Sequence, residues 1–133
     1  MRKRLLVVAA ALVDAEGRVL LARRPEGKHL GGMYEFPGGK IEPEETPEQA
    51  LIREFREELG VELCPTCFAP VTFVTYPYVE HDLILLLYIA RKWEGIPTPH
   101  EGQELIWRRP RDMRSLPMPP ADVPLVEALM DLL

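Results

Sequence analysis

Three glutamates within five positions are the residues of this sequence best suited to chemistry. Glu57 and Glu58 follow Glu54 by three and four positions, spacings that bring side chains to one face of a helix. Like charges so placed destabilise a helix, and hard divalent cations with oxygen ligands offset that repulsion. The cluster indicates a metal site. The alternative is a solvated acidic face with local ion pairs such as Arg53 to Glu57.

A helix must present these carboxylates, and its ends can be read from the sequence. Thr46 is a good N-cap, Pro47 suits the first helical position, and Gln49 completes a capping box. Gly60 supplies the C-terminal stop. The face opposite the glutamates is expected to be buried through Leu51, Phe55 and Leu59.

A longer pattern surrounds the cluster. Residues 39 to 61 read GKIEPEETPEQALIREFREELGV, and this stretch resembles the Nudix box. The matching positions are Gly39, Glu45, Arg53, Glu54, Glu57, Glu58, Gly60 and Val61. Phe55 stands where the family usually has Ile, Leu or Val, a change that concerns packing and not chemistry.

The resemblance extends nearly end to end, to the MutT-like branch, whose best-known members hydrolyse 8-oxo-dGTP. The matching stretches are Ala22-Arg23-Arg24, Glu35 to Lys40, Trp93-Glu94-Gly95, Glu101-Gly102-Gln103 and Pro119-Pro120-Ala121. The resemblance implies one Nudix domain over residues 1–133. Its class is α+β, with a mixed β-sheet sandwiched between α-helices. The implied cofactor is Mg²⁺, with Mn²⁺ as a possible substitute.

The resemblance also assigns roles at the metal site. The implied metal ligands are the carbonyl of Gly39 and the side chains of Glu54, Glu57, Glu58 and Glu101. Glu54 is the first candidate for activating water and Glu101 the second, and the sequence does not separate ligand from base. Arg53 is expected to act in catalysis by orienting a glutamate, and Glu45 to have a similar structural role.

Cations and aromatic residues are expected on the substrate side of the site. Two cations would help an acidic protein hold a polyphosphate, although Lys40 is equally well explained as a surface charge. Core packing explains the two aromatic residues at least as well as base binding does. The expected substrate contacts are Arg24 and Lys40 for phosphate, Phe36 and Tyr78 as apolar walls, and His29 and His81 nearby.

Asp122 and His81 depart from the relatives that act on oxidised guanine, which carry Asn and Arg at these positions. An Asn amide can donate to O6 and accept from the N7 hydrogen of 8-oxoguanine, whereas an ionised Asp only accepts. The departures leave room for a base that presents an amino group, such as cytosine. Asp122 also suits the N-cap of the last helix.

Three classes of function follow. The leading expectation is a nucleoside triphosphate pyrophosphohydrolase acting on 8-oxo-dGTP and releasing the monophosphate and pyrophosphate. A second is a Nudix hydrolase for CTP, a modified dCTP, ADP-ribose or a dinucleoside polyphosphate. A third is a nucleotide-sensing domain without turnover, which has no need of a full set of metal-binding glutamates.

The whole chain gives bounds on partners and location. It has 133 residues and a formal net charge of −5, a balance that argues against a nucleic-acid partner. The apolar run from Leu5 to Val13 is too short to span a bilayer and is interpreted as a buried strand, with a signal peptide as the minority alternative. We expect no membrane partner and a cytoplasmic location. The oligomeric state stays open.

The remaining expectations concern cysteines and strands. Cys64 and Cys67 are expected to be reduced loop residues, because no second pair completes a zinc site. The chain order of expected elements is as follows: paired strands at 4–13 and 18–23, a loop at 25–33, an extended piece at 34–36, strands at 70–77 and 82–90, a short strand at 104–107, and a helix from about residue 123 after a Pro-rich stretch at 117–120.

Overall fold

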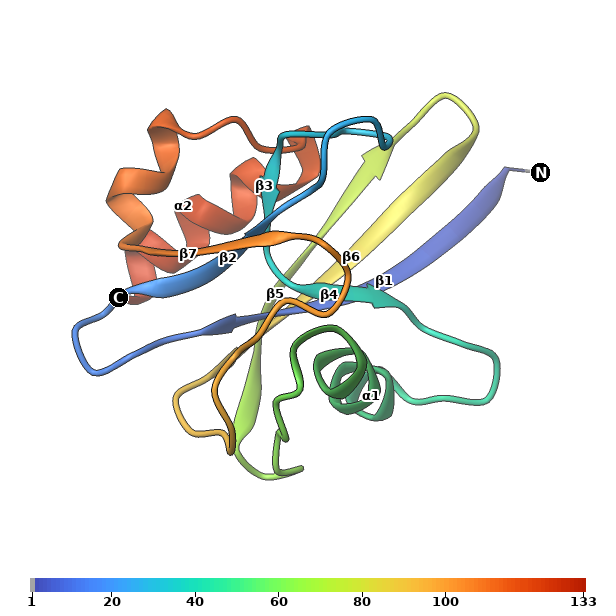
Figure 1. The fold of residues 1–133 in the computed structure, drawn as a ribbon. Helices are drawn as coiled ribbons and strands as arrows, with labels where there is room; N and C mark the ends of the chain where they lie inside the picture. Colours follow the sequence, from blue (N-terminus) through green and yellow to red (C-terminus); the bar gives the residue numbers. More distant parts are fainter. Residues whose placement is uncertain (1) are drawn as a thin grey trace.

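A computed structural model describes residues 2–133. These residues form seven strands and two α-helices, with two short 3₁₀ segments before the last helix (Figure 1). In order they are β1 (Lys3–Leu12), β2 (Val19–Arg23), β3 (Tyr34–Glu35), β4 (Gly38–Lys40), α1 (Pro47–Leu59), β5 (Phe68–Pro77), β6 (His81–Ala90), β7 (Glu104–Arg108), η1 (Pro110–Ser115), η2 (Pro120–Asp122) and α2 (Val123–Leu132).

The strands form two sheets. The larger has the order β4-β1-β6-β5 and is mixed, because β1 runs parallel to β6 while β4 and β5 are antiparallel to their neighbours. The smaller has the order β3-β2-β7. The expected pairing of residues 4–13 with 18–23 is reduced to one antiparallel bridge, Val13–Val19, because β1 and β2 enter different sheets. Local hydrophobic patterns predict strands but not the partners they choose.

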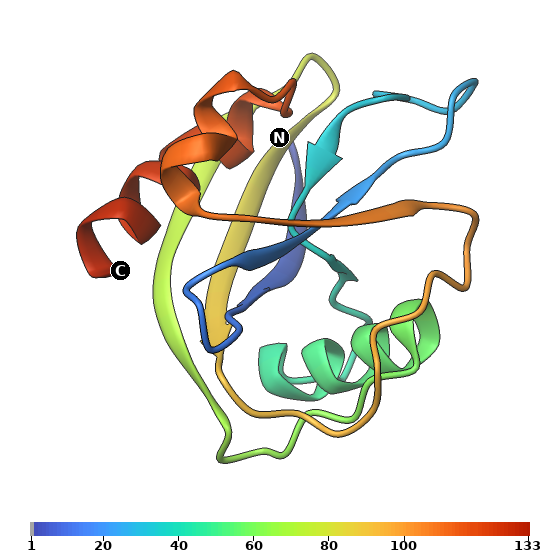
Figure 2. The same ribbon diagram turned by 60° about the vertical axis from the view of Figure 1, so that its left-hand side comes forward.

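The two helices cover opposite faces of the larger sheet (Figures 1 and 2). Alternate residues of a strand point to opposite faces, and β1 shows this directly. Val8, Ala10 and Leu12 pack with the buried side of α1, whereas Ala9 and Ala11 pack with α2. The expected α+β sandwich is therefore confirmed, and β4, which carries Gly39, lies beside the part of α1 that carries Arg53 and Glu54.

Helix α1 begins and ends as predicted. The Thr46 hydroxyl accepts a hydrogen bond from the Gln49 N–H, and the Gln49 side chain accepts one from the Thr46 N–H, which completes the capping box. Gly60 adopts the left-handed conformation, with φ of 66°, that ends the helix. The predicted buried stripe is confirmed, and Leu51, Phe55 and Leu59 are 0% exposed.

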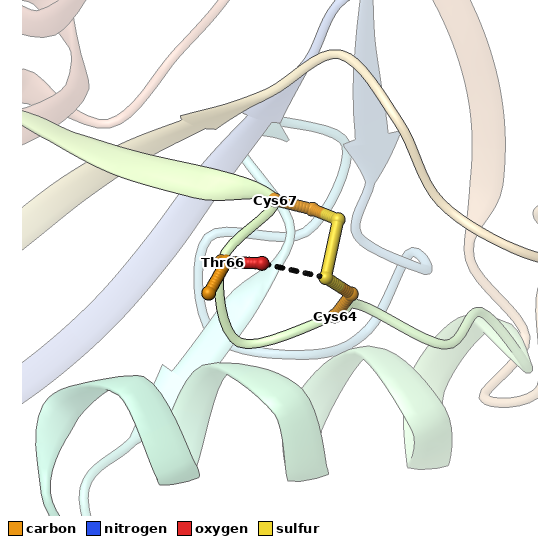
Figure 3. Close-up of a disulfide and its surroundings, with 3 residues drawn as sticks. All are labelled: Cys64, Thr66 and Cys67. Carbon is orange, nitrogen blue, oxygen red and sulfur yellow. Dashed lines mark hydrogen bonds between the residues drawn. A yellow bond between two sulfur atoms is a disulfide. The ribbon is translucent and has the colours of Figure 1, made fainter.

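Cys64 and Cys67 form a disulfide, so the expectation of reduced cysteines is wrong (Figure 3). The intervening Pro65-Thr66 makes a tight turn in which the Cys67 N–H donates to the Cys64 carbonyl at 2.9 Å. That turn sets the two Cα atoms 5.1 Å apart, within the range that a disulfide spans. Across residues 2–133, no helix combines the length and apolar character needed to cross a membrane.

Candidate active site

Arg53 is the centre of the polar network on α1. Its guanidinium binds both oxygens of Glu45, with Nε–Oε2 at 2.6 Å and Nη2–Oε1 at 2.9 Å. It also donates to Glu54 Oε1 at 2.8 Å, to Glu57 Oε2 at 3.3 Å and to the Lys40 carbonyl at 3.0 Å. A planar fork of donors holds several acceptors in fixed relation. Arg53 thus links the loop before α1, strand β4 and two of the three clustered glutamates.

Glu45 is held by this network and not by solvent. The hydrogen bonds from Arg53 lower the pKa of the Glu45 carboxyl, so it stays ionised. In turn, Glu45 raises the pKa of Arg53, with Glu54 adding to the effect. These contacts agree with the structural role expected for both residues. They leave Arg53 as a residue that orients carboxylates.

Gly39 lies against the side chain of Glu54. A Cβ atom built on Gly39 would overlap the carboxylate of Glu54. The backbone of β4 therefore lies directly against that carboxylate. The role of the Gly39 carbonyl as a metal ligand stays a prediction. A neighbouring constraint acts at Gly38, where a Cβ atom would overlap the backbone of Val8 on β1.

Glu58 carries the strongest electrostatic signal of the cluster. Its pKa is raised to about 9, first by burial, then by the hydrogen bond to Glu54 and by the negative charges of Glu54, Glu101 and Glu35. Its Oε2 atom is buried and has no hydrogen-bond partner within residues 2–133. A buried carboxylate oxygen without a donor, surrounded by other carboxylates, is the arrangement that a cation stabilises.

The donor set fits a hard divalent cation, although it does not yet converge on one point. Among the described residues, no group of three His, Cys, Asp or Glu side chains is arranged as a ready metal site. Mutual repulsion explains this, because Glu57 is 57% exposed at its side chain and turns toward Arg53. The chemistry of the donors and the orphaned oxygen of Glu58 are what fit Mg²⁺ or Mn²⁺.

Glu101 reaches the cluster from a loop between β6 and β7. It is exposed, and its neighbours His100 and Gln103 bind the Glu58 carbonyl, which places the backbone of Glu101 beside the end of α1. Its N–H donates to the Gln103 side chain at 2.8 Å. The structure thus brings Glu101 to the same end of α1 as Glu58, over 40 positions away in sequence.

A second polar group lies where β2, β3 and η2 meet. Arg24 on the chain after β2 donates from Nε to Glu35 Oε2 at 2.9 Å and from Nη1 to the His29 carbonyl at 3.2 Å. Burial raises the pKa of Glu35, and the Arg24 charge opposes that shift. Arg24 is therefore placed by Glu35 and by the loop that contains His29.

Asp122 belongs to this group. The residue is only 6% exposed, and its Oδ2 atom accepts a hydrogen bond from the Phe36 N–H at 3.3 Å. Burial and, after it, the negative charge of Glu35 raise the pKa of Asp122 to about 7, against the opposing effects of the Phe36 N–H and Arg24. The expected N-cap role is wrong. Asp122 precedes α2 but makes no side-chain capping bond, because its own backbone is already helical and its carboxyl turns to β3.

The other expected base contacts are divided. Tyr78 is partly buried, and its ring centroid lies 5.5 Å from that of His81. Burial is the main cause that raises the pKa of Tyr78, and the negative charge of Asp122 is the second. Phe36 is 4% exposed and packs in the core, so the Asp122 contact is made by its backbone. Lys40 is exposed on β4, where its carbonyl binds Arg53. The structure gathers Arg24, Tyr78, His81 and Asp122 and leaves Lys40 near the glutamates.

Three polar residues of the site had no assigned role from the sequence. Glu35 places Arg24 and influences Asp122, while His100 and Gln103 bind carbonyls at the end of α1. Glu35 and Gln103 lie within stretches that match the MutT-like branch, so a signal existed for them. No local pattern points to His100, whose partner is 43 positions earlier.

Comparison with known proteins agrees with this geometry. The family model described as the NUDIX domain matches residues 3–129, nearly the whole chain. The chain belongs to the Nudix family. Its similarity to MutT-like members, expected from the sequence, is also found in solved structures. The MutT Nudix hydrolase from Burkholderia pseudomallei superposes with a TM-score of 0.85 at 27% identity, covering 96% of this chain and 98% of that one.

Two relatives from Escherichia coli (strain K12) are named for different nucleotide substrates. A CTP pyrophosphohydrolase is 38% identical over 129 residues, which is 97% of this chain and 94% of the relative. An 8-oxo-dGTP diphosphatase is 32% identical over 127 residues, 96% of this chain and 97% of the relative. This Nudix hydrolase is therefore similar to enzymes named for two different nucleotides.

Proposed function

We propose that this Nudix hydrolase cleaves nucleoside triphosphates to the monophosphate and pyrophosphate, and that it requires Mg²⁺ or Mn²⁺. The observation that carries the proposal is the carboxylate cluster of α1, in which Glu54 lies against Gly39 and Glu58 has a buried oxygen without a donor. A domain that only binds nucleotide has no need of this full set of clustered glutamates, whereas a divalent cation with oxygen ligands would offset the repulsion among them.

Each residue of the site has a task in this reaction. Glu54, Glu57, Glu58, Glu101 and the carbonyl of Gly39 would hold the metal. When bound, the metal supplies charge neutralisation for the phosphate oxygens and lowers the pKa of water. Glu54 is the first candidate to take the proton from the attacking water and Glu101 the second. The new bond joins the water oxygen to phosphorus, and the bond to the pyrophosphate oxygen breaks.

The base is assigned to the side of the molecule where Asp122 lies. The first candidate substrate is 8-oxo-dGTP. An ionised Asp122 can accept a hydrogen bond from its N7–H, and a protonated Asp122 can donate one to its O6. The second candidate is CTP or a modified dCTP, favoured because an ionised carboxylate accepts from an amino group. Asp122 is buried beside Tyr78 and Arg24, so either contact would form away from bulk water.

We place the activity in the cytoplasm, where nucleotide pools are maintained, with a small-molecule nucleotide and no nucleic acid as partner. The acidic balance of the chain, with a formal charge of −5, supports the absence of a nucleic-acid partner.

A product assay across a nucleotide panel tests the proposal. The panel contains 8-oxo-dGTP, dGTP, CTP, a modified dCTP, ADP-ribose and a dinucleoside polyphosphate, each with Mg²⁺. We expect monophosphate and pyrophosphate from 8-oxo-dGTP or CTP, and turnover at least ~10²-fold lower in Glu54→Gln, the scale for loss of a positioned catalytic carboxylate. Glu54→Gln prepared in parallel also controls for contaminating phosphatases. Release of a nucleoside diphosphate and orthophosphate would contradict the proposal. So would the absence of turnover with every triphosphate.

A further inference from the structure

The carbonyl groups at the C-terminal end of α1 are bound by a distant segment of the chain. The last carbonyls of a helix have no partners within it. Here the Glu57 carbonyl accepts from His100 Nδ1 at 3.1 Å, and the Glu58 carbonyl accepts from the His100 N–H at 2.9 Å. The Leu59 carbonyl accepts from the Thr98 N–H at 3.0 Å. The loop before β7 thus acts as a cap for the helix that carries the acidic cluster.

His100 is fixed at this place by its ring as well as its backbone. The ring lies against Gly60, where an added Cβ atom would approach His100 Cε1 to 2.9 Å. A carbonyl only accepts, so Nδ1 of His100 carries the hydrogen that binds Glu57. Two donors of one residue therefore engage two consecutive carbonyls, which fixes both the position and the orientation of His100.

Glu101 follows His100 directly and is held on its other side by Gln103. The Gln103 amide oxygen accepts the Glu101 N–H at 2.8 Å, and its Nε2 lies 3.5 Å from the Glu58 carbonyl. Glu101 thus sits between two residues that bind the last turn of α1. Because His100 and Gln103 both bind the Glu58 carbonyl, the backbone of Glu101 is held beside the turn of α1 that carries Glu57 and Glu58.

We propose that His100 is a positioning residue, which sets the place of Glu101 relative to Glu57 and Glu58 by binding the last turn of α1. The proposal rests on the proposed function, since it assigns Glu101 to the metal site. A loop carboxylate serves catalysis only if it is held in place, because small misplacements of a reacting group lower turnover steeply. His100 acts on the carboxylates and not on the nucleotide base.

Kinetics in two backgrounds test whether His100 works through Glu101. In the otherwise native chain, His100→Ala should lower kcat by about 10-fold or more and leave the nucleotide KM within about twofold, the range for residues that orient metal ligands. His100→Asn offers an amide N–H near the Nδ1 position and should recover most of kcat. In a Glu101→Gln background, His100→Ala should cause little further loss. Thr98→Val is the matched control, because its hydroxyl bonds only to Ile96 within the loop.

Two measurements on the metal-free and Mn²⁺-titrated protein make the test independent of turnover. Amide hydrogen exchange of Thr98 and His100 should be slow in the native chain, faster in His100→Ala and slow again in His100→Asn. Mn²⁺ affinity by calorimetry should fall at least several-fold in His100→Ala, and no further when added to Glu101→Gln.

The outcomes separate this proposal from the proposed function. Equal losses from His100→Ala in both backgrounds, in kcat or in Mn²⁺ affinity, would show that His100 does not act through Glu101 and would overturn the inference. Unchanged kcat and Mn²⁺ affinity in His100→Ala would do the same. The native chain could hydrolyse no nucleotide while His100→Ala weakens Mn²⁺ binding in the native background but not in Glu101→Gln. That result would overturn the proposed function and support the positioning of Glu101.

Discussion

Asp122 is an acid in surroundings that disfavour its charge. Burial and the nearby Glu35 raise its pKa to about 7, so the carboxyl is protonated at lower pH and ionised at higher pH. Protonated, it can donate to O6 of 8-oxoguanine, and ionised, it only accepts. The preference between substrates should therefore depend on pH through this one residue.

The change Asp122→Asn tests that dependence. An Asn amide donates at every pH, and its oxygen can still accept from the Phe36 N–H. We expect kcat/KM for 8-oxo-dGTP relative to CTP to rise several-fold at about pH 8.5, since one buried hydrogen bond is worth ~1 kcal/mol. At about pH 6, where Asp122 is largely protonated, the variant and the native chain should differ less. The ratio of the two substrates cancels general effects of pH on turnover. An equal effect of the substitution at both pH values would show that Asp122 does not read the base.

At the scale of single residues, the sequence predicted identities better than contacts. Helical spacing places Glu54 and Glu58 on one face of α1, and the family resemblance named Glu101, whose neighbours His100 and Gln103 bind the end of that helix. Their joint role as metal ligands stays a prediction. Asp122 was expected to cap α2, a local interaction, but it binds the Phe36 N–H 86 positions away. Such long-range hydrogen bonds leave no trace in the neighbouring sequence.

At the scale of elements, α1 is the part most fully determined by its own sequence. Its cap, its C-terminal glycine and its buried stripe are local features, and all three were predictable. The partners of β1 and β2 were not, because strand pairing depends on which hydrophobic faces meet in the complete fold. The attachment of the 98–103 loop to α1 is also non-local and was not foreseen.

Arg53 joins α1 to the elements around it, and Arg53→Lys tests that function. Lys keeps the charge but cannot bind Glu45 through two nitrogens while also reaching Glu54 and the Lys40 carbonyl. We expect kcat to fall by about 10-fold or more, with a smaller change in nucleotide KM, as for residues that orient ligands of a metal. Arg56→Lys on the same helix is the control, because Arg56 pairs only with the exposed Glu62. Equal kinetics for Arg53→Lys and Arg56→Lys would remove Arg53 from the site.

At the scale of the whole molecule, the disulfide lies in the connection between α1 and β5. Cys64 and Cys67 border a surface hollow of about 400 Å³ with Glu62, Leu63, Lys92, Trp93 and Glu94, and the carboxylate cluster is not part of its lining. The bond closes a loop of only four residues, which limits how far it can constrain the unfolded chain.

Replacing both cysteines, Cys64→Ser with Cys67→Ser, should therefore separate stability from activity. By the chain-entropy estimate a loop this short stabilises by about 2 kcal/mol, so Tm should fall by several degrees. Turnover should stay within about twofold of the native value, because surface changes away from a site rarely alter it. The native chain in reductant should show the same Tm as the double variant. A large loss of turnover on reduction would show that the 64–67 turn communicates with the site.

The most direct test of the central claim is the metal dependence of nucleotide hydrolysis. Pyrophosphate release from the best triphosphate should be followed in Mg²⁺, then in excess EDTA, then after Mg²⁺ or Mn²⁺ is restored. The three acidic side chains on one face of α1, with an unpartnered oxygen on Glu58, predict that turnover vanishes with the chelator and returns with the metal. Full turnover in excess EDTA would contradict the account, because the carboxylate cluster would then have no metal to bind and no part in the reaction.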